Sequence, residues 1–114
     1  MANNQPALDT VFHALSDPTR RAVIQQLGQG SATVSELAEP FDMALPSFMK
    51  HIRVLETSGL IGSKKVGRVR TCEIIPKRLA VVESWLNEQR ALWEARVDRL
   101  AEYVETLTTK EGKK

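Results

Sequence analysis

From Lys77 to about Thr109, within the longest such segment of the chain, no glycine or proline interrupts the sequence. At 1.5 Å per residue, a helix over this segment is roughly 50 Å long. Apolar residues recur along it on one helical face, with Trp85 and Leu92 beside that face: Leu79, Val82, Leu86, Trp93, Val97, Leu100, Val104 and Leu107. A chain of 114 residues is too short to cover such a helix by itself, so the segment predicts a helical partner.

The simplest partner is a second copy of the same chain. We therefore expect a homodimer in which residues 77–109 form the dimerisation helix, assisted by the first helix of the chain. The expected interface consists of Leu8, Val11, Phe12, Trp85, Leu92, Trp93, Val97, Leu100 and Val104. The alternative is two helices, joined by an unmarked bend, that fold back onto the rest of the chain.

The formal net charge of +2 conceals an uneven distribution of charge along the chain. Residues 1–44 carry two basic and five acidic groups, and residues 79–114 carry six basic and seven acidic groups. Residues 45–78, by contrast, carry eight basic groups and two acidic ones. A basic segment of this kind attracts polyanions, although clustered charge on a solvated surface gives the same pattern.

Composition excludes several classes of protein. No apolar run approaches the roughly 18 residues of a membrane span, and no basic stretch followed by an apolar core marks a secretory signal. The single cysteine, Cys72, excludes a disulfide framework and a cysteine-rich zinc site within one chain. We therefore expect one small cytoplasmic domain with no membrane partner and no cofactor.

Capping and breaking residues divide the rest of the chain into short elements. Asp17 and Pro18 together start a helix, because Asp accepts from free amides and Pro suits the first helical position. Thr33 and Glu36 have the spacing of a capping box, which starts another short helix. We expect a flexible leader over residues 1–6, a folded domain over residues 7–76, the long helix over residues 77–109 and a solvated tail over residues 110–114.

Residues 45–57 predict a helix with one apolar and one polar, basic face. Its apolar stripe is expected to comprise Leu45, Phe48, Ile52 and Leu55. After Gly59, two short strands around a glycine turn predict a basic hairpin over residues 61–75. The order of short capped helix, tight link, basic helix and basic hairpin is that of a winged helix-turn-helix, in a mainly helical fold with a small β-hairpin.

This arrangement suits duplex DNA. A helix fits the major groove, where its first residues reach the edges of the bases. A flanking hairpin can place Lys or Arg on phosphates or in the minor groove. The pattern therefore predicts a sequence-specific regulator that binds double-stranded DNA.

Four ordered motifs resemble those of the ArsR family of bacterial winged-helix repressors. They are Asp17-Pro18-Thr19-Arg20-Arg21, Val34-Ser35-Glu36-Leu37-Ala38, Lys50-His51-Ile52-Arg53-Val54-Leu55-Glu56 and Ser58-Gly59-Leu60-Ile61. The helix with Trp85 and Trp93 is similar to the C-terminal dimerisation helix of one branch that does not sense metals. The resemblance implies a homodimer that binds a pseudopalindromic operator and usually represses transcription.

The resemblance also implies which residues contact DNA. Base-contacting positions correspond to Pro46, Ser47, Met49 and Lys50, backbone-contacting neighbours to His51 and Arg53, and wing positions to Lys64, Lys65, Arg68 and Arg70. The alternative for His51 is a polar residue packed at the helix edge, and the alternative for the wing is a solvated hairpin. Two residues depart from the family pattern. Ala44 stands where relatives often have Ser or Thr as the helix N-cap, and Met49 stands where a small polar residue is usual.

Many members of this family sense metals, but suitable ligands are missing here. Residues 34–41 contain no cysteine and the last helix contains no histidine, which leaves His13, His51 and Cys72. We expect no metal site, and we interpret Cys72 as a half-buried strand residue because a reactive thiol needs exposure and a lowered pKa. The alternative is a repressor that responds to metal or redox state through an unrecognised site between subunits.

Two further alternatives concern function as a whole. The chain has no glycine-rich phosphate loop, no recognisable acid and base pair and no nucleophile motif, so we do not expect an enzyme. A winged helix can also bind an acidic protein, but apolar or aromatic anchors are then expected on the wing. We expect a cytoplasmic regulator that lies on the nucleoid when bound to DNA. Whether an effector acts on it is open, and a site for one is expected where the first and last helices form the dimer interface.

Overall fold

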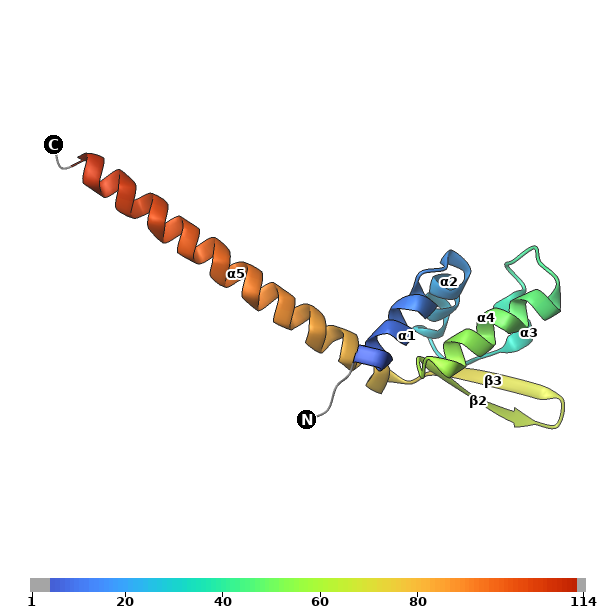
Figure 1. The fold of residues 1–114 in the computed structure, drawn as a ribbon. Helices are drawn as coiled ribbons and strands as arrows, with labels where there is room; N and C mark the ends of the chain where they lie inside the picture. Colours follow the sequence, from blue (N-terminus) through green and yellow to red (C-terminus); the bar gives the residue numbers. More distant parts are fainter. Residues whose placement is uncertain (1–4, 113–114) are drawn as a thin grey trace. The chain divides into compact units, whose positions relative to one another are not determined.

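The computed structural model describes residues 5–112, and the chain divides into two units, residues 1–82 and residues 83–114. The elements are α1 (Gln5–Leu15), α2 (Pro18–Leu27), β1 (Ala32–Thr33), α3 (Val34–Ala38), α4 (Leu45–Thr57), β2 (Ile61–Val66), β3 (Val69–Ile74) and α5 (Pro76–Gly112) (Figure 1). The predicted mainly helical fold with a small β-hairpin is confirmed. Of the predicted leader and tail, residues 1–4 and 113–114 lie outside the described residues, whereas residues 5–6 belong to α1 and residues 110–112 to α5.

The predicted helix caps are confirmed. The carboxylate of Asp17 accepts the backbone N–H of Arg20 at 3.0 Å. In the capping box, the N–H of Glu36 donates to Thr33 Oγ1 at 3.1 Å, and the N–H of Thr33 donates to Glu36 Oε1 at 2.9 Å. Hydrogen bonding of the Glu36 carboxylate by the backbone N–H and by the hydroxyl of Thr33 lowers the pKa of Glu36. Ala44 precedes α4 without any side-chain cap, so α4 depends on tertiary packing for its position.

The core of the first unit combines side chains from α1 to α4, the sheet and the start of α5. Its buried apolar members are Leu8, Val11, Ala14, Val23, Leu27, Leu37, Phe48, Ile52, Leu55, Leu60, Ile61, Cys72 and Val82. Burial of each large side chain stabilises the fold by ~2 kcal/mol. This core fixes α4 to the sheet and to the first two helices.

Three predicted positions are corrected by the structure. Leu8 and Val11 were expected at a dimer interface, but they are only 5% and 0% exposed because α1 packs this face against α2 and α4. Phe12, by contrast, is 40% exposed. Leu45 was expected in the apolar stripe of α4, but it is 56% exposed because it lies one turn before Phe48, the first residue of α4 that enters the core.

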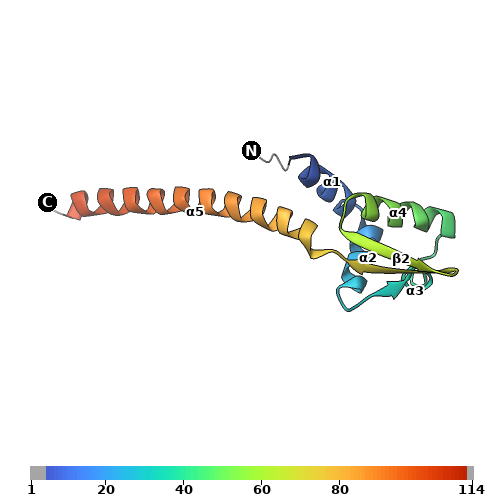
Figure 2. The ribbon, with the colours of Figure 1, turned by 90° about the horizontal axis from the view of Figure 1, so that it is seen from below.

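The sheet has three antiparallel strands in the order β1-β3-β2. The predicted hairpin is present as β2 and β3, and Gly67 adopts a φ of 61° at its turn, which an L side chain rarely does. The sequence pattern did not predict β1, because a strand of two residues shows no alternation and Thr33 also caps α3. In Figures 1 and 2 the hairpin runs alongside α4, with the hairpin tip and the first residues of α4 at the same end.

The last helix, α5, is one continuous helix, so the alternative of two helices with a bend is wrong. Its first turns belong to the first unit, beyond the boundary predicted at residue 76, because Val82 is buried in the core. Residues 83–109 are exposed throughout. Within the described part of the chain, no helix is long and apolar enough to cross a membrane.

Candidate nucleic-acid interface

The outer face of α4 carries the residues expected to contact bases. Phe48, Ile52 and Leu55 are fully buried, and this fixes the rotation of α4 so that its opposite face points to solvent. On that face the side chains of Pro46, Ser47, Lys50 and Arg53 are exposed, while Met49 is half-buried. The helix therefore presents one hydroxyl and two cations in a fixed orientation.

Strand register fixes which face of the wing, β2–β3, three of its four basic residues occupy. Lys65 and Arg70 are cross-strand partners, in line with the pair Ser63 and Cys72 that lies nearer the core. Lys64 pairs with Thr71 and therefore points to the other face of the hairpin. Two like charges directly opposite each other destabilise a hairpin. Glu56, which lies 3.5 Å from Arg70, offsets part of this repulsion.

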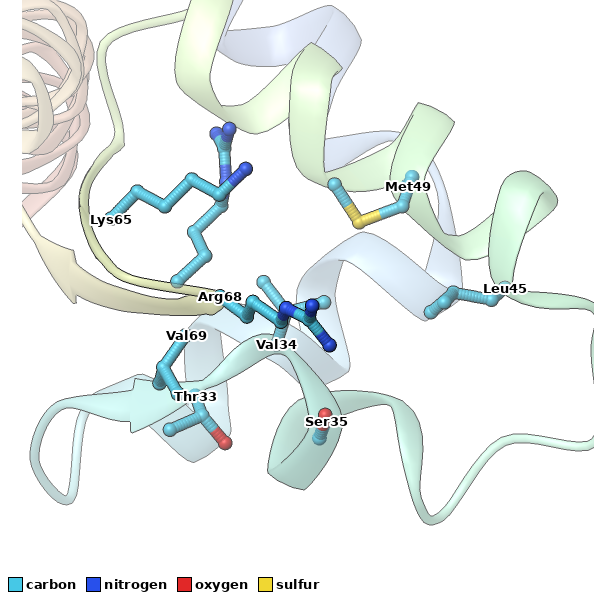
Figure 3. Close-up of a pocket in the computed structure, with 9 residues that line it drawn as sticks. Thr33, Val34, Ser35, Leu45, Met49, Lys65, Arg68 and Val69 are labelled. Atoms are coloured by element: carbon cyan, nitrogen blue, oxygen red, sulfur yellow. The ribbon is translucent and has the colours of Figure 1, made fainter.

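A hollow of about 430 Å³ lies between α4, the wing and the start of α3 (Figure 3). It is lined by Thr33, Val34, Ser35, Leu45, Met49, Lys65, Arg68, Val69 and Arg70. The structure thus brings together Met49 and three of the four predicted wing cations. Sequence reasoning missed the contributions of α3 and of Leu45, because their position beside the wing depends on how the sheet packs.

Glu56 links α4 to the wing. Its Oε2 accepts the hydroxyl of Ser63 at 2.7 Å, and Arg70 Nη1 lies 3.5 Å from the same oxygen and 3.3 Å from the Ser63 hydroxyl. The ion pair is partly exposed and contributes little stability by itself. Because it crosses from α4 to β2 and β3, it restricts the angle between the helix and the hairpin. Arg70, predicted as a DNA contact, is therefore also a structural tether.

Arg20 is the main polar group beneath α4. It is only 9% exposed, and its guanidinium donates to the carbonyl of Ala14 at 2.7 Å and to that of His13 at 3.1 Å. Arg21 donates to the carbonyl of Leu15 at 2.9 Å. The last turn of a helix leaves such carbonyls without partners inside the helix, and Ser16 also donates to the carbonyl of His13. The two adjacent arginines of the Asp17–Arg21 motif therefore cap the C-terminus of α1.

The same guanidinium holds His51, which was expected to contact the DNA backbone. Arg20 Nη1 lies 3.1 Å from His51 Nδ1. Because a guanidinium can only donate, Nδ1 accepts this bond when the ring is neutral. Asp17 Oδ2 lies 3.7 Å from the same nitrogen. Nδ1 is thus engaged within the protomer, which agrees with the alternative of a polar residue packed at the helix edge.

The charge of Asp17 adds a dependence of stability on pH. Partial desolvation raises the pKa of Asp17, but the N–H of Arg20 and the positive charges of protonated His51 and of Arg20 outweigh it, so the pKa lies below the ordinary 3.8. A group whose folded-state pKa is depressed contributes stability above its unfolded pKa and loses it as the pH falls through the folded value.

We expect Asp17→Asn, which keeps a capping oxygen, to lower the free energy of unfolding by ~0.5 kcal/mol at neutral pH. The difference from the unmodified chain should begin to shrink as the pH falls through the ordinary pKa of 3.8 and should vanish below the lowered pKa of the folded state. Urea unfolding at a series of pH values measures this. A difference that stays constant with pH would show that the carboxylate charge plays no part.

Cys72 is fully buried rather than half-buried as predicted. Burial, followed by the negative charge of Glu56, raises the pKa of its thiol. This disfavours the thiolate, which is the form that binds metals and reacts. Among the side chains that the structure describes, no group of three or more His, Cys, Asp or Glu residues could hold a metal ion.

Comparison with known proteins agrees with this architecture. Residues 15–62 match the family described as "Helix-turn-helix domain". The chain is 33% identical over 79 residues to the HTH-type transcriptional regulator Rv2034 of Mycobacterium tuberculosis, covering 69% of this chain and 74% of that protein. It is 61% identical to the crystal structure of an ArsR family transcriptional regulator, RHA00566, with a TM-score of 0.79 over 82% of this chain and 97% of the other. The chain belongs to the ArsR family.

As an ArsR-family member with a winged helix-turn-helix, the protein is a DNA-binding transcriptional regulator. Another relative, the transcriptional repressor SdpR of Bacillus subtilis, is 34% identical over 61 residues, covering 54% of this chain and 68% of that protein. The fold is shared with a homodimeric winged helix-turn-helix DNA-binding domain, Mb0332 of Mycobacterium bovis. That domain is 20% identical, with a TM-score of 0.59 over 78% of this chain and 90% of the other.

Proposed function

We propose that the protein is a homodimeric repressor that binds a pseudopalindromic operator. In each half-site, α4 lies in the major groove and the wing contacts phosphates or the minor groove. The observation that carries this proposal is the hollow, because it places the exposed start of α4 beside Lys65 and Arg68. Base edges and phosphates lie similarly close together along a duplex.

The exposed apolar face of α5 supports the homodimer. Within residues 83–109, Leu92, Trp93 and Leu100 are 66%, 63% and 63% exposed, which is a high cost in water for a chain that acts alone. A second copy supplies the same face, and an isologous contact buries both at once. We therefore assign the interface to Trp85, Leu92, Trp93, Val97, Leu100 and Val104 of α5.

Repression follows when the dimer simply occupies the operator. A dimer seated on an operator near a promoter excludes other proteins from the same DNA, without the need for a further activity. The relative from Bacillus subtilis is itself a transcriptional repressor. The dimer interface is where an effector would act, because a small shift there changes the spacing of the two α4 helices.

Selection of bound fragments from the host genome with the purified protein tests this proposal, with parallel reactions that contain added metals or a chelator. We expect enrichment of inverted repeats whose half-site centres are about 10 base pairs, or a multiple of that, apart. A reporter downstream of such a repeat should be silenced when the protein is present. No enrichment over random DNA, or enriched sites without two-fold symmetry, would refute the proposal.

Lys50 is exposed on α4, and we expect it to discriminate at one base pair of each half-site. Lys50→Ala should lose roughly 1–3 kcal/mol of discrimination against substitutions at that pair, because the ammonium no longer reaches guanine O6 or N7. Titrations with single-substitution duplexes measure this. Equal losses on operator and random DNA would make Lys50 a backbone contact instead.

Arg68 lies at the turn of the wing, and we expect it to contact a phosphate. Arg68→Ala should weaken binding to all duplexes and reduce the slope of log K against log salt by about one unit. Arg90→Ala is the matched control, since it removes an exposed cation from α5 and should leave the slope unchanged. An unchanged slope in Arg68→Ala would remove this residue from the phosphate contacts.

One observation favours a second function, the binding of an acidic protein by the wing. Val66 and Val69 are cross-strand partners at the wing tip and are 78% and 53% exposed, as expected of apolar anchors. The genome selection separates the two functions, because only DNA binding enriches a shared sequence.

A further inference from the structure

The exposed side chain of Leu45 is not explained by the fold. Leu45 is the first residue of α4 and is 56% exposed, so it contributes little to the core. Together with Met49, one turn later, it lines the hollow between α4 and the wing. Figure 3 shows both side chains directed into the hollow, on the side where Arg68 lies. Leu45 and Met49 thus form an apolar pair among cations, and in the absence of a bound partner this pair faces water.

The cations indicate what fills this space. Lys65, Arg68 and Arg70 line the same hollow. Arg70 is paired with Glu56, but the exposed Lys65 and Arg68 still favour an anionic occupant such as a DNA duplex. In the major groove, the apolar group on a base edge is the C5-methyl of thymine. The first turn of α4 offers Leu45, Pro46 and Ser47, none of which can form the bidentate hydrogen bonds that read guanine or adenine.

We propose that Leu45 reads the methyl group of one thymine in each half-site, with Met49 forming the adjacent apolar wall. This proposal rests on the proposed function, because it places the start of α4 in the major groove. It adds a base preference that the resemblance to the family could not supply. Neighbouring cations hold the phosphates of the same half-site, so that the apolar contact is enclosed by DNA.

The test uses the full chain and the tightest duplex from the genome selection, with each thymine replaced in turn by deoxyuridine. Deoxyuridine pairs as thymine does but lacks the C5-methyl. Loss of one buried methyl corresponds to ~0.8 kcal/mol, so we expect about fourfold weaker binding at one thymine of each half-site. Fluorescence anisotropy measures the dissociation constants at fixed salt.

Leu45→Ala decides whether this residue makes the contact. We expect the variant to bind the unmodified duplex several-fold more weakly and to lose the fourfold deoxyuridine penalty, because no side chain remains to meet the methyl. The substitution removes an exposed side chain, so the thermal unfolding midpoint should stay the same. Met49→Ala, which changes the adjacent wall, is the matched control and should retain most of the penalty.

Three outcomes would overturn the assignment while leaving the proposed function intact. They are specific binding with no deoxyuridine penalty in the half-sites, a penalty that persists in Leu45→Ala, and a penalty that only Met49→Ala abolishes. Failure of the unmodified chain to prefer any duplex over random DNA would instead refute the proposed function, and this inference with it.

Discussion

Replacing Val97 and Leu100 of α5 by glutamate is expected to convert the dimer to a monomer and to weaken operator binding by about 100-fold or more. Both side chains are exposed in the protomer, 46% and 63%, and belong to the face assigned to the partner copy. Two buried charges without counter-charges are strongly unfavourable at an apolar interface. A monomer then engages one half-site only and loses the effective concentration of the second, which is worth about 10²- to 10⁴-fold.

Sedimentation velocity and operator titration measure the two effects together. Ala95→Glu is the control for an added glutamate, since Ala95 is exposed on the opposite side of the same helix and the substitution adds one of the two charges. It should leave both the dimer and the affinity unchanged. Deletion of residues 85–114 should have the same effect as the double substitution. A double variant that still sediments as a dimer would place the interface elsewhere.

Arg20→Ala is expected to lower the free energy of unfolding by ~3 kcal/mol. The guanidinium donates to two carbonyls at the end of α1 and to His51 on α4. Its removal leaves the buried carbonyl of Ala14 and Nδ1 of His51 without this donor, at ~1–3 kcal/mol for each group, whereas the carbonyl of His13 keeps the N–H and hydroxyl of Ser16. Since α4 loses a polar link to α1 and α2, DNA affinity should also fall.

Arg21→Ala is the matched control for this prediction. Arg21 is adjacent, of the same type and on the same helix, but it is exposed and donates to the carbonyl of Leu15 at 2.9 Å. We expect its replacement to cost less than ~1 kcal/mol. Urea unfolding at one fixed protomer concentration compares the variants, because dimerisation makes apparent stability depend on concentration. Equal losses from both substitutions would mean that burial of Arg20 has no special role.

The sequence predicted those features whose cause lies within a few residues. Asp17 accepts from the N–H three residues later, Thr33 and Glu36 cap each other, and Gly59 adopts a φ of 79° after α4. The capping box and the glycine after α4 need no distant partner, so the local sequence pattern is sufficient to locate them. The helix-turn-helix and the hairpin follow from their order. The long C-terminal helix was predicted because neither glycine nor proline interrupts it.

Tertiary structure decided the features whose cause lies far along the chain. Val11 is buried by α2 and α4, and His51 is held by Arg20, 31 positions away. Helical spacing marks an apolar face but does not state whether the same chain or a partner covers it. For the same reason it placed Leu45 in the core, whereas the hollow beside the wing exposes it.

By itself, the sequence determined the order of elements, the caps and the concentration of basic residues between positions 45 and 78, because these depend on local hydrogen bonding and on composition. Only the tertiary structure decided which of those residues surround one hollow. It gave Arg70 and His51 partners within the protomer and left Leu45 exposed beside Arg68. The physical reason is that strand register and helix packing, which join distant segments, set where each side chain points.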